Sequence, residues 1–340
     1  MIILTIESTC DETAAAVIAS GPHVLGAAVA TQTELHARFQ GVVPEVAARA
    51  HVQRILPVID EAIRQADIDP ADLDAIAVAN TPGLAGSLMV GLTAAKTLAV
   101  AWNKPLVAVN HLQAHIYACQ MSDPGEIYPC VGLIVSGGHT SLYACHSATE
   151  LDYLGGTIDD AAGEAFDKVG AMLGLPFPGG PSVSRAAAAG NPKAHDFPRS
   201  LVGEDHLNFS FSGLKTAVRY CLVGPGKQDF SQLDLSEQQL ADLCASFEQA
   251  VVDCLVAKSR QAIRQTGFSK LCVGGGVAAN GRLRAALAEA ADRDGFGLVI
   301  APPDLCTDNA VMGAVALEQI DRHGYDSLDV DIHPGLQRGY

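Results

Sequence analysis

The sequence predicts an α/β protein built from two duplicated lobes that face a cleft. Residues 2–19 and 130–145 share one pattern, in which an apolar strand, a polar or glycine-rich turn and a second apolar strand follow one another. Segments with apolar residues at helical spacing follow each hairpin. The chain has 340 residues, which exceeds the length of roughly 250 to 300 at which one hydrophobic core stops growing. Ligands of two-lobed proteins usually bind in the cleft, so we expect the functional residues there.

The predicted elements of the first half alternate between helices and buried strands. Apolar residues recur at helical spacing over 43–66, whereas 74–79 is an uninterrupted apolar run typical of a buried strand. Residues 87–101 are mostly small and predict a closely packed helix. A short strand over 107–109 then leads through Asn110 into the next helix.

The second half continues the pattern with longer loops. Residues 159–181 are expected to be helical and to end in the loop Pro-Phe-Pro-Gly-Gly-Pro, because proline and glycine interrupt helices. We expect a loop and a short helix within 204–228 and a long amphipathic helix over 235–265. The last elements are a strand over 270–273 that runs into three glycines, a helix over 280–291, a small-residue helix over 310–316 and an irregular tail.

Composition limits the class of protein and its partners. Hydrophobic residues make up 49% of the chain and no apolar run is long enough to cross a bilayer, so we expect no membrane association. The net charge is −16, which opposes non-specific attraction to nucleic acid, because that affinity comes largely from Lys and Arg at phosphates. An RNA substrate would therefore require a local basic surface or a partner protein.

The cysteines and the N-terminus indicate a reducing compartment. The nine cysteines are scattered without a C-x-x-C pair, which predicts reduced thiols rather than disulfides or a zinc ribbon. We expect Cys10 and Cys306 to be small buried fillers. The N-terminus reads as a first strand rather than a signal peptide, and a cytoplasmic location is expected.

His111 and His115 are the first candidate metal ligands. Two imidazoles four residues apart share one face of a helix, and Asp308 lies in an expected turn just before the helix over 310–316. Two histidines and one carboxylate, with further coordination positions open, suit iron or zinc that must also meet a substrate. Surface or helix-capping histidines are the commoner explanation of this spacing alone.

Three other histidines compete for a metal role. They are His36, His51 and His139. Because His36 and His51 have many polar neighbours in sequence, we expect both to be solvated rather than ligands.

Two glycine-rich turns are candidate ligand sites. Gly137 and Gly138 directly follow an apolar strand, where missing side chains allow backbone N–H groups to approach an anion. An ordinary hairpin turn explains them equally well. The glycines at 274–276 could leave room for a base or ribose at a helix N-terminus, or serve close packing alone, and Asn280 could simply cap the helix.

An acidic segment over 159–168 has two readings. Its residues Asp160, Glu164 and Asp167 fall on one helical face, which could bind ribose hydroxyls or hold Lys168 against a phosphate. Acidic residues at a helix start also complement the helix dipole without any ligand. Lys215, in a hydroxyl-rich stretch, could meet a phosphate or belong to a helix cap.

Taken together, these motifs resemble the tRNA N6-adenosine threonylcarbamoyltransferase family, formerly called O-sialoglycoprotein endopeptidase. The match runs in order from residue 2 to about 315, and several strings are too long for chance. Gln40 departs from the pattern, since glycine is frequent there. The matching segments are 6–13, 41–45, 111–115, 136–140, 159–168, 211–217 and 306–309.

The resemblance implies a fold and a set of site residues. The fold is the two-lobed ATPase fold of actin, sugar kinases and heat-shock chaperones, with a nucleotide cleft between duplicated lobes. The first lobe would span 1–125 and be completed by 310–340, and the second would span 126–309. Iron(II), or else zinc, would bind to His111, His115 and Asp308. Substrate contacts would come from Ile134, Val135, Ser136, Gly137, Gly138, Asp167, Gly180 and Asn280.

The resemblance also implies an acyl transfer. A threonylcarbamoyl group would pass from threonylcarbamoyl-AMP to N6 of the adenosine beside the anticodon, in tRNAs that read codons beginning with A. Asp11 and Glu12, in the first hairpin turn, would accept the proton. The implied partners are a separate threonylcarbamoyl-AMP synthase, a metal-free paralogue subunit and a small P-loop ATPase.

Three rival functions are weighed against this one. A metalloprotease needs a glutamate directly after the first histidine of its metal helix, and Leu112 stands there. A small-molecule kinase and an ATP-driven chaperone module share the fold. Phosphoryl transfer relies on magnesium held by carboxylates, so the histidine pair favours the transferase over both.

Overall fold

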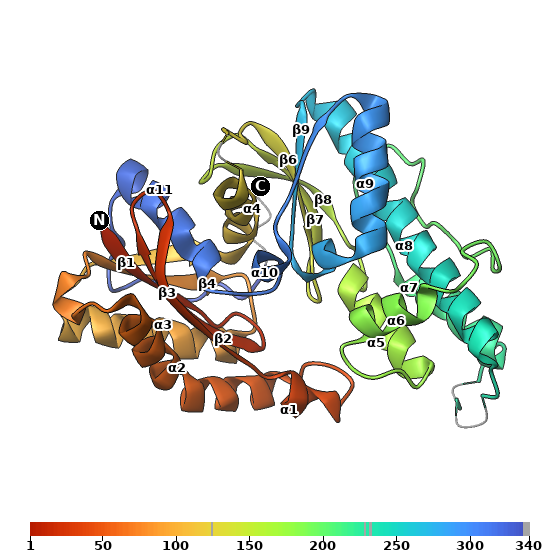
Figure 1. Cartoon of the computed structure of the whole chain (residues 1–340), viewed down its shortest axis with the longest axis horizontal. Coiled ribbons are helices and arrows are strands. Elements are labelled where there is room, and N and C mark those ends of the chain that lie inside the picture. Colours follow the sequence, from red (N-terminus) through yellow and green to blue (C-terminus); the bar gives the residue numbers. More distant parts are fainter. Residues whose placement is uncertain (124, 228, 231–232, 336–340) are drawn as a thin grey trace. The chain divides into compact units, whose positions relative to one another are not determined.

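The computed structural model describes residues 1–123, 125–227, 229–230 and 233–335 (Figure 1). The chain divides into two compact units. Unit 1 contains Met1–Glu126, His146–Leu151 and the chain from Asp304 onward. Unit 2 contains Ile127–Cys145 and Asp152–Pro303. Residues 304–309 thus fall in unit 1, whereas the lobe boundaries expected from the resemblance put them in the second lobe; those boundaries stay a prediction.

The sheet of unit 1 begins with the first predicted hairpin. β1 and β2 pair antiparallel, with Ile3 opposite Ile18, and β3 continues the meander. β4 and β5 then extend the sheet on the other side of β1 in parallel orientation. The strand order is β3-β2-β1-β4-β5. The strands are β1 (Ile2–Glu7), β2 (Glu12–Ala19), β3 (His23–Thr31), β4 (Ala75–Thr81) and β5 (Leu106–Asn110).

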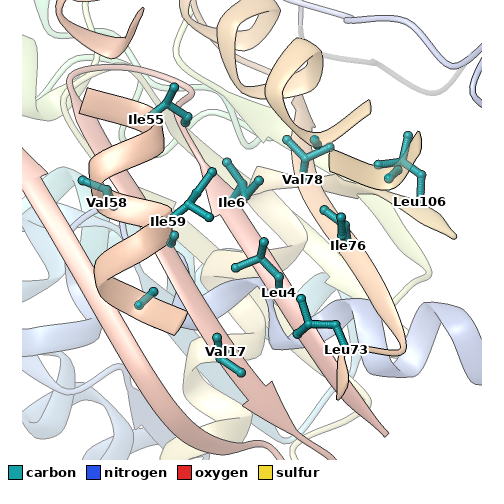
Figure 2. Close-up of a cluster of buried hydrophobic side chains, with 14 of the residues drawn as sticks. Leu4, Ile6, Val17, Ile55, Val58, Ile59, Leu73, Ile76, Val78 and Leu106 are labelled. Carbon is teal, nitrogen blue, oxygen red and sulfur yellow. The ribbon is translucent and has the colours of Figure 1, made fainter. Parts of the chain in front are cut away.

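Helix α2 covers one face of this sheet because its apolar residues repeat at helical spacing. Figure 2 shows Ile59 of α2 next to Ile6 of β1, and both belong to one buried cluster with Ile55 of the same helix. Burial of such side chains stabilises the unit by about 1.5–3 kcal/mol each. The helices of unit 1 are α1 (Thr33–Ala37), α2 (Pro44–Ala66), α3 (Ala85–Ala101), α4 (His111–Ser122), α10 (Pro303–Cys306) and α11 (Val315–His323), with 3-10 turns at Pro70–Asp72 and Val311–Ala314.

Unit 2 repeats the topology of unit 1. β6 and β7 form the second predicted hairpin, and β9 and β10 add in parallel beside β6. The strand order is β10-β9-β6-β7-β8. In the reverse direction, β8-β7-β6-β9-β10, it matches the order β3-β2-β1-β4-β5 of unit 1 strand for strand. The duplicated α/β fold is therefore confirmed. The strands are β6 (Cys130–Val135), β7 (Thr140–Cys145), β8 (Leu151–Gly156), β9 (Lys270–Gly274) and β10 (Gly297–Ile300).

The helices of unit 2 include the long predicted one. α8 starts at a capping box formed by Ser236 and Gln239 and ends at Gly267, whose φ of 71° is the left-handed region that favours glycine. The helices are α5 (Ala162–Met172), α6 (Gly179–Ala187), α7 (Ser212–Val223), α8 (Glu237–Thr266) and α9 (Gly281–Asp294), with a 3-10 turn at Gly276–Ala279.

Two local predictions are corrected. Gly179, Gly180 and Pro181 form the first turn of α6 rather than a loop, because proline fits the first turn of a helix, where its missing N–H removes no bond. The expected helix over 310–316 is a 3-10 turn at Val311–Ala314 followed by α11. Gln40 adopts a φ of 56°, in the region that favours glycine.

The structure agrees with the predictions of reduced thiols and of no membrane-spanning segment in its described residues. All nine cysteines are free; Cys306 is buried, while Cys10 is only partly so. Among the described residues, no helix is long and apolar enough to span a membrane.

Candidate metal centre and ligand turns

Helix α4 sets the spacing of the two histidines. Its start is fixed by Asn110, whose side-chain oxygen accepts hydrogen bonds from the backbone N–H of Leu112 (2.8 Å) and Gln113 (3.4 Å). His111 is therefore the first helical residue, and His115 follows one turn later on the same face. The two rings meet edge to face, with their centroids 4.5 Å apart.

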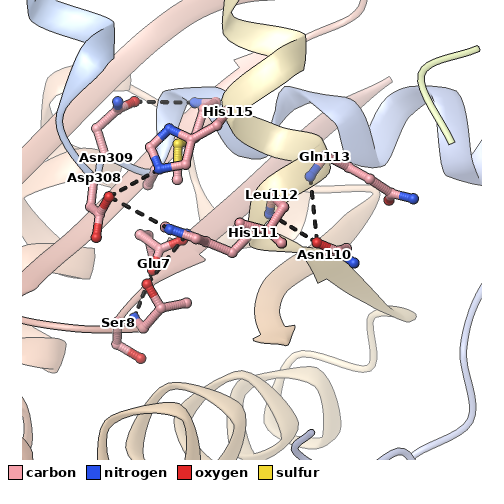
Figure 3. Close-up of polar contacts among 12 residues, drawn as sticks. Glu7, Ser8, Asn110, His111, Leu112, Gln113, His115, Asp308 and Asn309 are labelled. Carbon is pink, nitrogen blue, oxygen red and sulfur yellow. Dashed lines mark hydrogen bonds and ion pairs between the residues drawn. The ribbon is translucent and has the colours of Figure 1, made fainter. Parts of the chain in front are cut away.

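Both imidazoles converge on one carboxylate oxygen. Oδ1 of Asp308 lies 3.6 Å from Nε2 of His111 and 3.1 Å from Nε2 of His115 (Figure 3). One ligand atom from each of these three residues lies within 4.8 Å of the other two. Because both histidines are almost fully buried while Asp308 keeps 18% of its side chain exposed, the cluster has one accessible side.

Glu7 and Thr9 fix the orientation of His111. Nδ1 of His111 is 3.0 Å from Oε2 of Glu7 and 3.2 Å from the Thr9 hydroxyl. Because a carboxylate only accepts, Nδ1 carries the proton, and in the neutral ring the Nε2 lone pair faces Asp308. The unprotonated Nε2 of each ring and the carboxylate oxygen of Asp308 are ligand atoms that a metal ion accepts, so this donor set fits a metal ion.

The charges around His111 support the same reading. Burial alone would lower the pKa of His111, but the negative charges of Glu7 and Asp308 outweigh it and raise that pKa to about 9. Burial and the neighbouring His111 lower the pKa of His115. The cluster therefore attracts one positive charge, which a proton or a metal ion supplies.

Asp308 is held by its neighbour in sequence. Asn309 donates from Nδ2 to the carbonyl of Thr307 (2.7 Å) and accepts from the N–H of Met312 (3.1 Å) at the start of the 3-10 turn. The hydroxyl of Thr5 on β1 donates to the carbonyl of Ala310 (2.6 Å) and fastens this turn to the sheet. Strand β1 thus supports the late carboxylate as well as Glu7.

The β1–β2 turn places an acidic pair in the same unit. Burial raises the pKa of Asp11, and burial together with the charge of Asp11 raises the pKa of Glu12 to about 7. Glu12 accepts a hydrogen bond from the Thr31 hydroxyl on Oε1, while its buried Oε2 has no partner among the described groups. Glu12 can therefore exchange a proton near neutral pH.

The expectation that His36 and His51 are solvated is wrong. Both are fully buried, and burial lowers the pKa of each. Nε2 of His51 donates to the carbonyl of Cys10 (2.9 Å), and Nδ1 accepts from the Thr13 hydroxyl (2.8 Å). The polar neighbours that suggested solvent are thus internal hydrogen-bond partners, and His51 fastens the β1–β2 turn to α2.

In unit 2 the turn between β6 and β7 has a backbone that side chains leave uncovered at two glycines. Gly163 packs so closely that a Cβ there would lie 2.6 Å from the Ser136 carbonyl, and a Cβ on Gly275 would lie 2.4 Å from that of Val135. Gly137 and Gly138, in contrast, have open space where a Cβ would stand. The turn is supported on one side and open on the other, as an anion-binding turn requires. Ile134 and Val135 are buried in β6, so that only their backbone could meet a ligand.

The other expected substrate residues lie at helix ends in unit 2. Oδ1 of Asp167 on α5 accepts from the N–H of Gly179 at the start of α6 (2.7 Å). Gly180, the next residue, has open space where a Cβ would stand. Asn280 caps α9 by accepting from the N–H of Leu283 (2.8 Å). The predicted helix cap is thus confirmed. The side-chain nitrogen of Asn280 also bonds to Ser184 and Glu248.

The acidic face of α5 is an ion-pair network. Lys168 bonds to Asp160 (2.7 Å) and Glu164 (2.8 Å), and Lys215 bonds to the other oxygen of Asp160 (2.6 Å). Although burial would raise the pKa of Asp160, its bonds to the two lysines lower it. The lysines therefore neutralise carboxylates, and only Asp167 of the expected face remains directed at α6.

Sequence reasoning missed Glu7. The one signal was an acidic residue at the end of a mostly apolar strand, directly before the hydroxyl pair Ser8-Thr9. A buried carboxylate requires a hydrogen-bond partner, and the partner of Glu7 is His111, which is close in space but distant in sequence.

Comparison with known proteins bears on this geometry. A family model described as tRNA N6-adenosine threonylcarbamoyltransferase matches residues 23–315. A protein of that name from Rhodopirellula baltica is 63% identical over all of this chain and 98% of its own length. One from Anaeromyxobacter dehalogenans is 50% identical over 92% of both chains.

Solved structures share the fold at low identity. Full-length HypF, in a phosphate- and nucleotide-bound form, superposes with a TM-score of 0.64 at 14% identity, over 96% of this chain and 47% of that one. Component A of the (R)-2-hydroxyglutaryl-CoA dehydratase from Acidaminococcus fermentans gives 0.53 at 13% identity, over 93% of this chain and 96% of its own.

Proposed function

This chain belongs to the tRNA N6-adenosine threonylcarbamoyltransferase family, and we propose that it transfers threonylcarbamoyl from threonylcarbamoyl-AMP to N6 of the adenosine 3′ of the anticodon. Its tRNA substrates are those that read codons beginning with A. The observation that carries this proposal is the 63% identity over the whole chain, joined to a buried histidine–aspartate cluster that fits a metal. The relatives favour this activity over the kinase alternative.

The reaction is an acyl transfer. The N6 nitrogen attacks the carbonyl carbon of the mixed anhydride, a C–N bond forms, and the C–O bond to phosphate breaks. AMP leaves with the electron pair, and the proton of N6 passes to a base. N6 is a weak nucleophile, so positioning of both substrates supplies much of the rate.

Glu12 is the proposed base, with Asp11 beside it. Its pKa of about 7 is matched to neutral pH, and its Oε2 is free to accept a proton. Burial is the main reason that this pKa is high, and the negative charge of the Asp11 carboxylate adds to it.

His111, His115 and Asp308 would hold one divalent ion, and iron(II) is our first choice. Two histidines and one carboxylate with open positions are typical of non-haem iron(II), while zinc accepts the same donors. A bound ion would supply Lewis-acid stabilisation of the negative charge that develops on the carbonyl oxygen. Glu7 would orient His111 for this role.

The adenylate is proposed to bind in unit 2. Backbone N–H groups of Gly137 and Gly138 would position the phosphate, since the turn is open on that side. Asp167, Gly180 and Asn280 would meet the nucleoside. Ile134, Val135 and Ser136 complete the turn through their backbone.

Partner proteins are part of the proposal. A net charge of −16 disfavours unaided tRNA binding, so we propose a metal-free paralogue subunit, a small P-loop ATPase and a separate synthase for the adenylate. Exposed apolar side chains on α2 support a protein contact: Val52 is 64% exposed and Leu56 is 61% exposed, one helical turn apart. With tRNA as its substrate, the protein would act in the cytoplasm.

A reconstituted assay tests the function. The chain is incubated with these partners, threonine, bicarbonate, ATP and unmodified tRNA, and digested tRNA is analysed by mass spectrometry for N6-threonylcarbamoyladenosine. We expect the modified nucleoside only when the chain is present. No product with every partner active would exclude the transferase function.

A further inference from the structure

Both N–H groups of the Asn280 side chain are occupied by the protein itself. Oδ1 caps α9, while Nδ2 donates to the Ser184 hydroxyl (2.9 Å) and to Oε1 of Glu248 (2.7 Å). An amide nitrogen has two hydrogens, so both are used. Asn280 can therefore meet a nucleoside only through the second lone pair of Oδ1, and a neighbouring acceptor could take a further donor of the ligand.

Glu248 on α8 is the group beside it. The Ser184 hydroxyl donates to its Oε1 (2.6 Å), the same oxygen that accepts from Asn280. No described group donates to Oε2, and no described Lys, Arg or His forms an ion pair with this carboxylate. Glu248 is nevertheless only 8% exposed. Oε2 is not one of the fully buried atoms without a partner, so a donor from outside the protein can reach it.

The surroundings of Glu248 indicate what that donor is. Its two partners lie on α6 and at the start of α9, the elements that carry Gly180 and Gly281. Both glycines have open space where a Cβ would stand. A carboxylate repels a phosphate and attracts hydroxyl or amine donors, which a nucleoside offers on its ribose and on N6 of adenine.

We propose that Glu248 determines specificity at the nucleoside end of the adenylate site. Oε1 positions Asn280 and Ser184, and Oε2 accepts a hydrogen bond from a ribose hydroxyl or from the exocyclic amine of adenine. The inference rests on the proposed function, because that function brings an adenylate to unit 2.

Glu248→Gln separates this role from a structural one. A glutamine has the same shape, and its Oε1 still accepts from Asn280 and Ser184, so a purely structural glutamate would be replaced without effect. Only the acceptor at Oε2 is exchanged for a donor. Glu289→Gln, an exposed change on α9, is the matched control.

Calorimetric titration of the full chain with AMP tests the proposal. We expect Glu248→Gln to weaken AMP binding by about 10- to 100-fold, which is the loss of one hydrogen bond to a charged group. Thermal unfolding should be unchanged, and Glu289→Gln should bind AMP as the unmodified chain does.

Two further ligands identify the donor. 2′-Deoxy-AMP lacks one ribose hydroxyl, and purine riboside monophosphate lacks the exocyclic amine. The ligand without the donor should bind the unmodified chain more weakly and should show no additional loss with Glu248→Gln.

Equal AMP affinity of Glu248→Gln and the unmodified chain would overturn the proposal, as would the absence of AMP binding by the unmodified chain. AMP binding that depends on Glu248 in a chain that forms no modified tRNA would instead contradict the proposed function alone. The two failures are therefore distinguishable.

Discussion

The two candidate sites are built in opposite ways. The cluster in unit 1 consists of ionisable side chains, the buried His111 and His115 and the partly exposed Asp308, with the buried Glu7 bonded to His111. The turn in unit 2 consists of backbone exposed by missing side chains at Gly137 and Gly138. A side-chain cluster suits an ion that polarises a reacting group, whereas a backbone turn suits a ligand that must only be held. Changes in unit 1 should therefore affect catalysis, and changes in unit 2 should affect binding.

Removal of both histidines should have the largest effect. His111→Ala combined with His115→Ala should abolish metal binding and lower the rate of tRNA modification about 1,000-fold or more, because a Lewis acid supplies several kcal/mol. Metal content by elemental analysis and initial rates measure the two effects. His323→Ala, an exposed histidine on α11, is the control. Unchanged metal content in the double variant would remove the site assignment.

Glu12→Gln tests the base in the same unit. Because Glu12 must be deprotonated to accept a proton, activity should rise with pH through about 7, and the glutamine variant should lose that rise and about 100-fold in rate. Rates of the two proteins between pH 5.5 and pH 8.5 provide the measurement. An unchanged pH profile in the variant would assign the base elsewhere.

The same substitution should stabilise the fold. The pKa of Glu12 is raised on folding, so its contribution to stability is fully present below the unfolded value of 4.5 and is lost as the pH rises through about 7. At pH 8, Glu12→Gln should therefore increase the free energy of unfolding measured with urea. A lower stability at that pH would contradict the burial cost assigned to this carboxylate.

Glu7→Gln should have a smaller effect than loss of a ligand. A glutamine accepts the hydrogen bond from Nδ1 of His111 without a negative charge, so it makes His111 a weaker ligand. Metal affinity should therefore fall by about 10- to 100-fold. Competition with a chelator of known affinity measures the change. AMP binding should be unaffected, and a matching loss there would remove the distinction between the two sites.

Two glycine substitutions test unit 2 with the smallest expected effects. Gly137→Ala meets open space, so stability should be retained while AMP binding weakens by about 10-fold. Gly275→Ala places a Cβ 2.4 Å from the Val135 carbonyl at a φ of 95°, so it should destabilise the unit by about 1–3 kcal/mol. Equal behaviour of the two variants would show that the turn has no open side.

The sequence predicted the two sites to different degrees. The duplicated hairpins, the long helices and the histidine spacing are periodic or local signals, and each appears in the structure as expected. Glu7 was missed because its partner lies 104 residues away, a separation that no local pattern reports.

The misjudged residues share one cause. His36 and His51 are predicted to be solvated from their polar neighbours in sequence, and one of the two interpretations of the acidic helical face holds Lys168 against a phosphate. In the folded chain those neighbours are internal partners, such as Thr13 for His51 and Asp160 for Lys168. Whether a polar residue meets water, a ligand or another side chain depends on contacts between distant segments. Sequence spacing does not contain them.

Metal removal and restoration tests the central claim most directly. The reconstituted enzyme is treated with a chelator, and formation of N6-threonylcarbamoyladenosine and AMP binding are measured before and after addition of iron(II) without oxygen. We predict that product formation is lost and then restored by iron(II), while AMP binding stays constant throughout. Full product formation by metal-free enzyme would contradict the account.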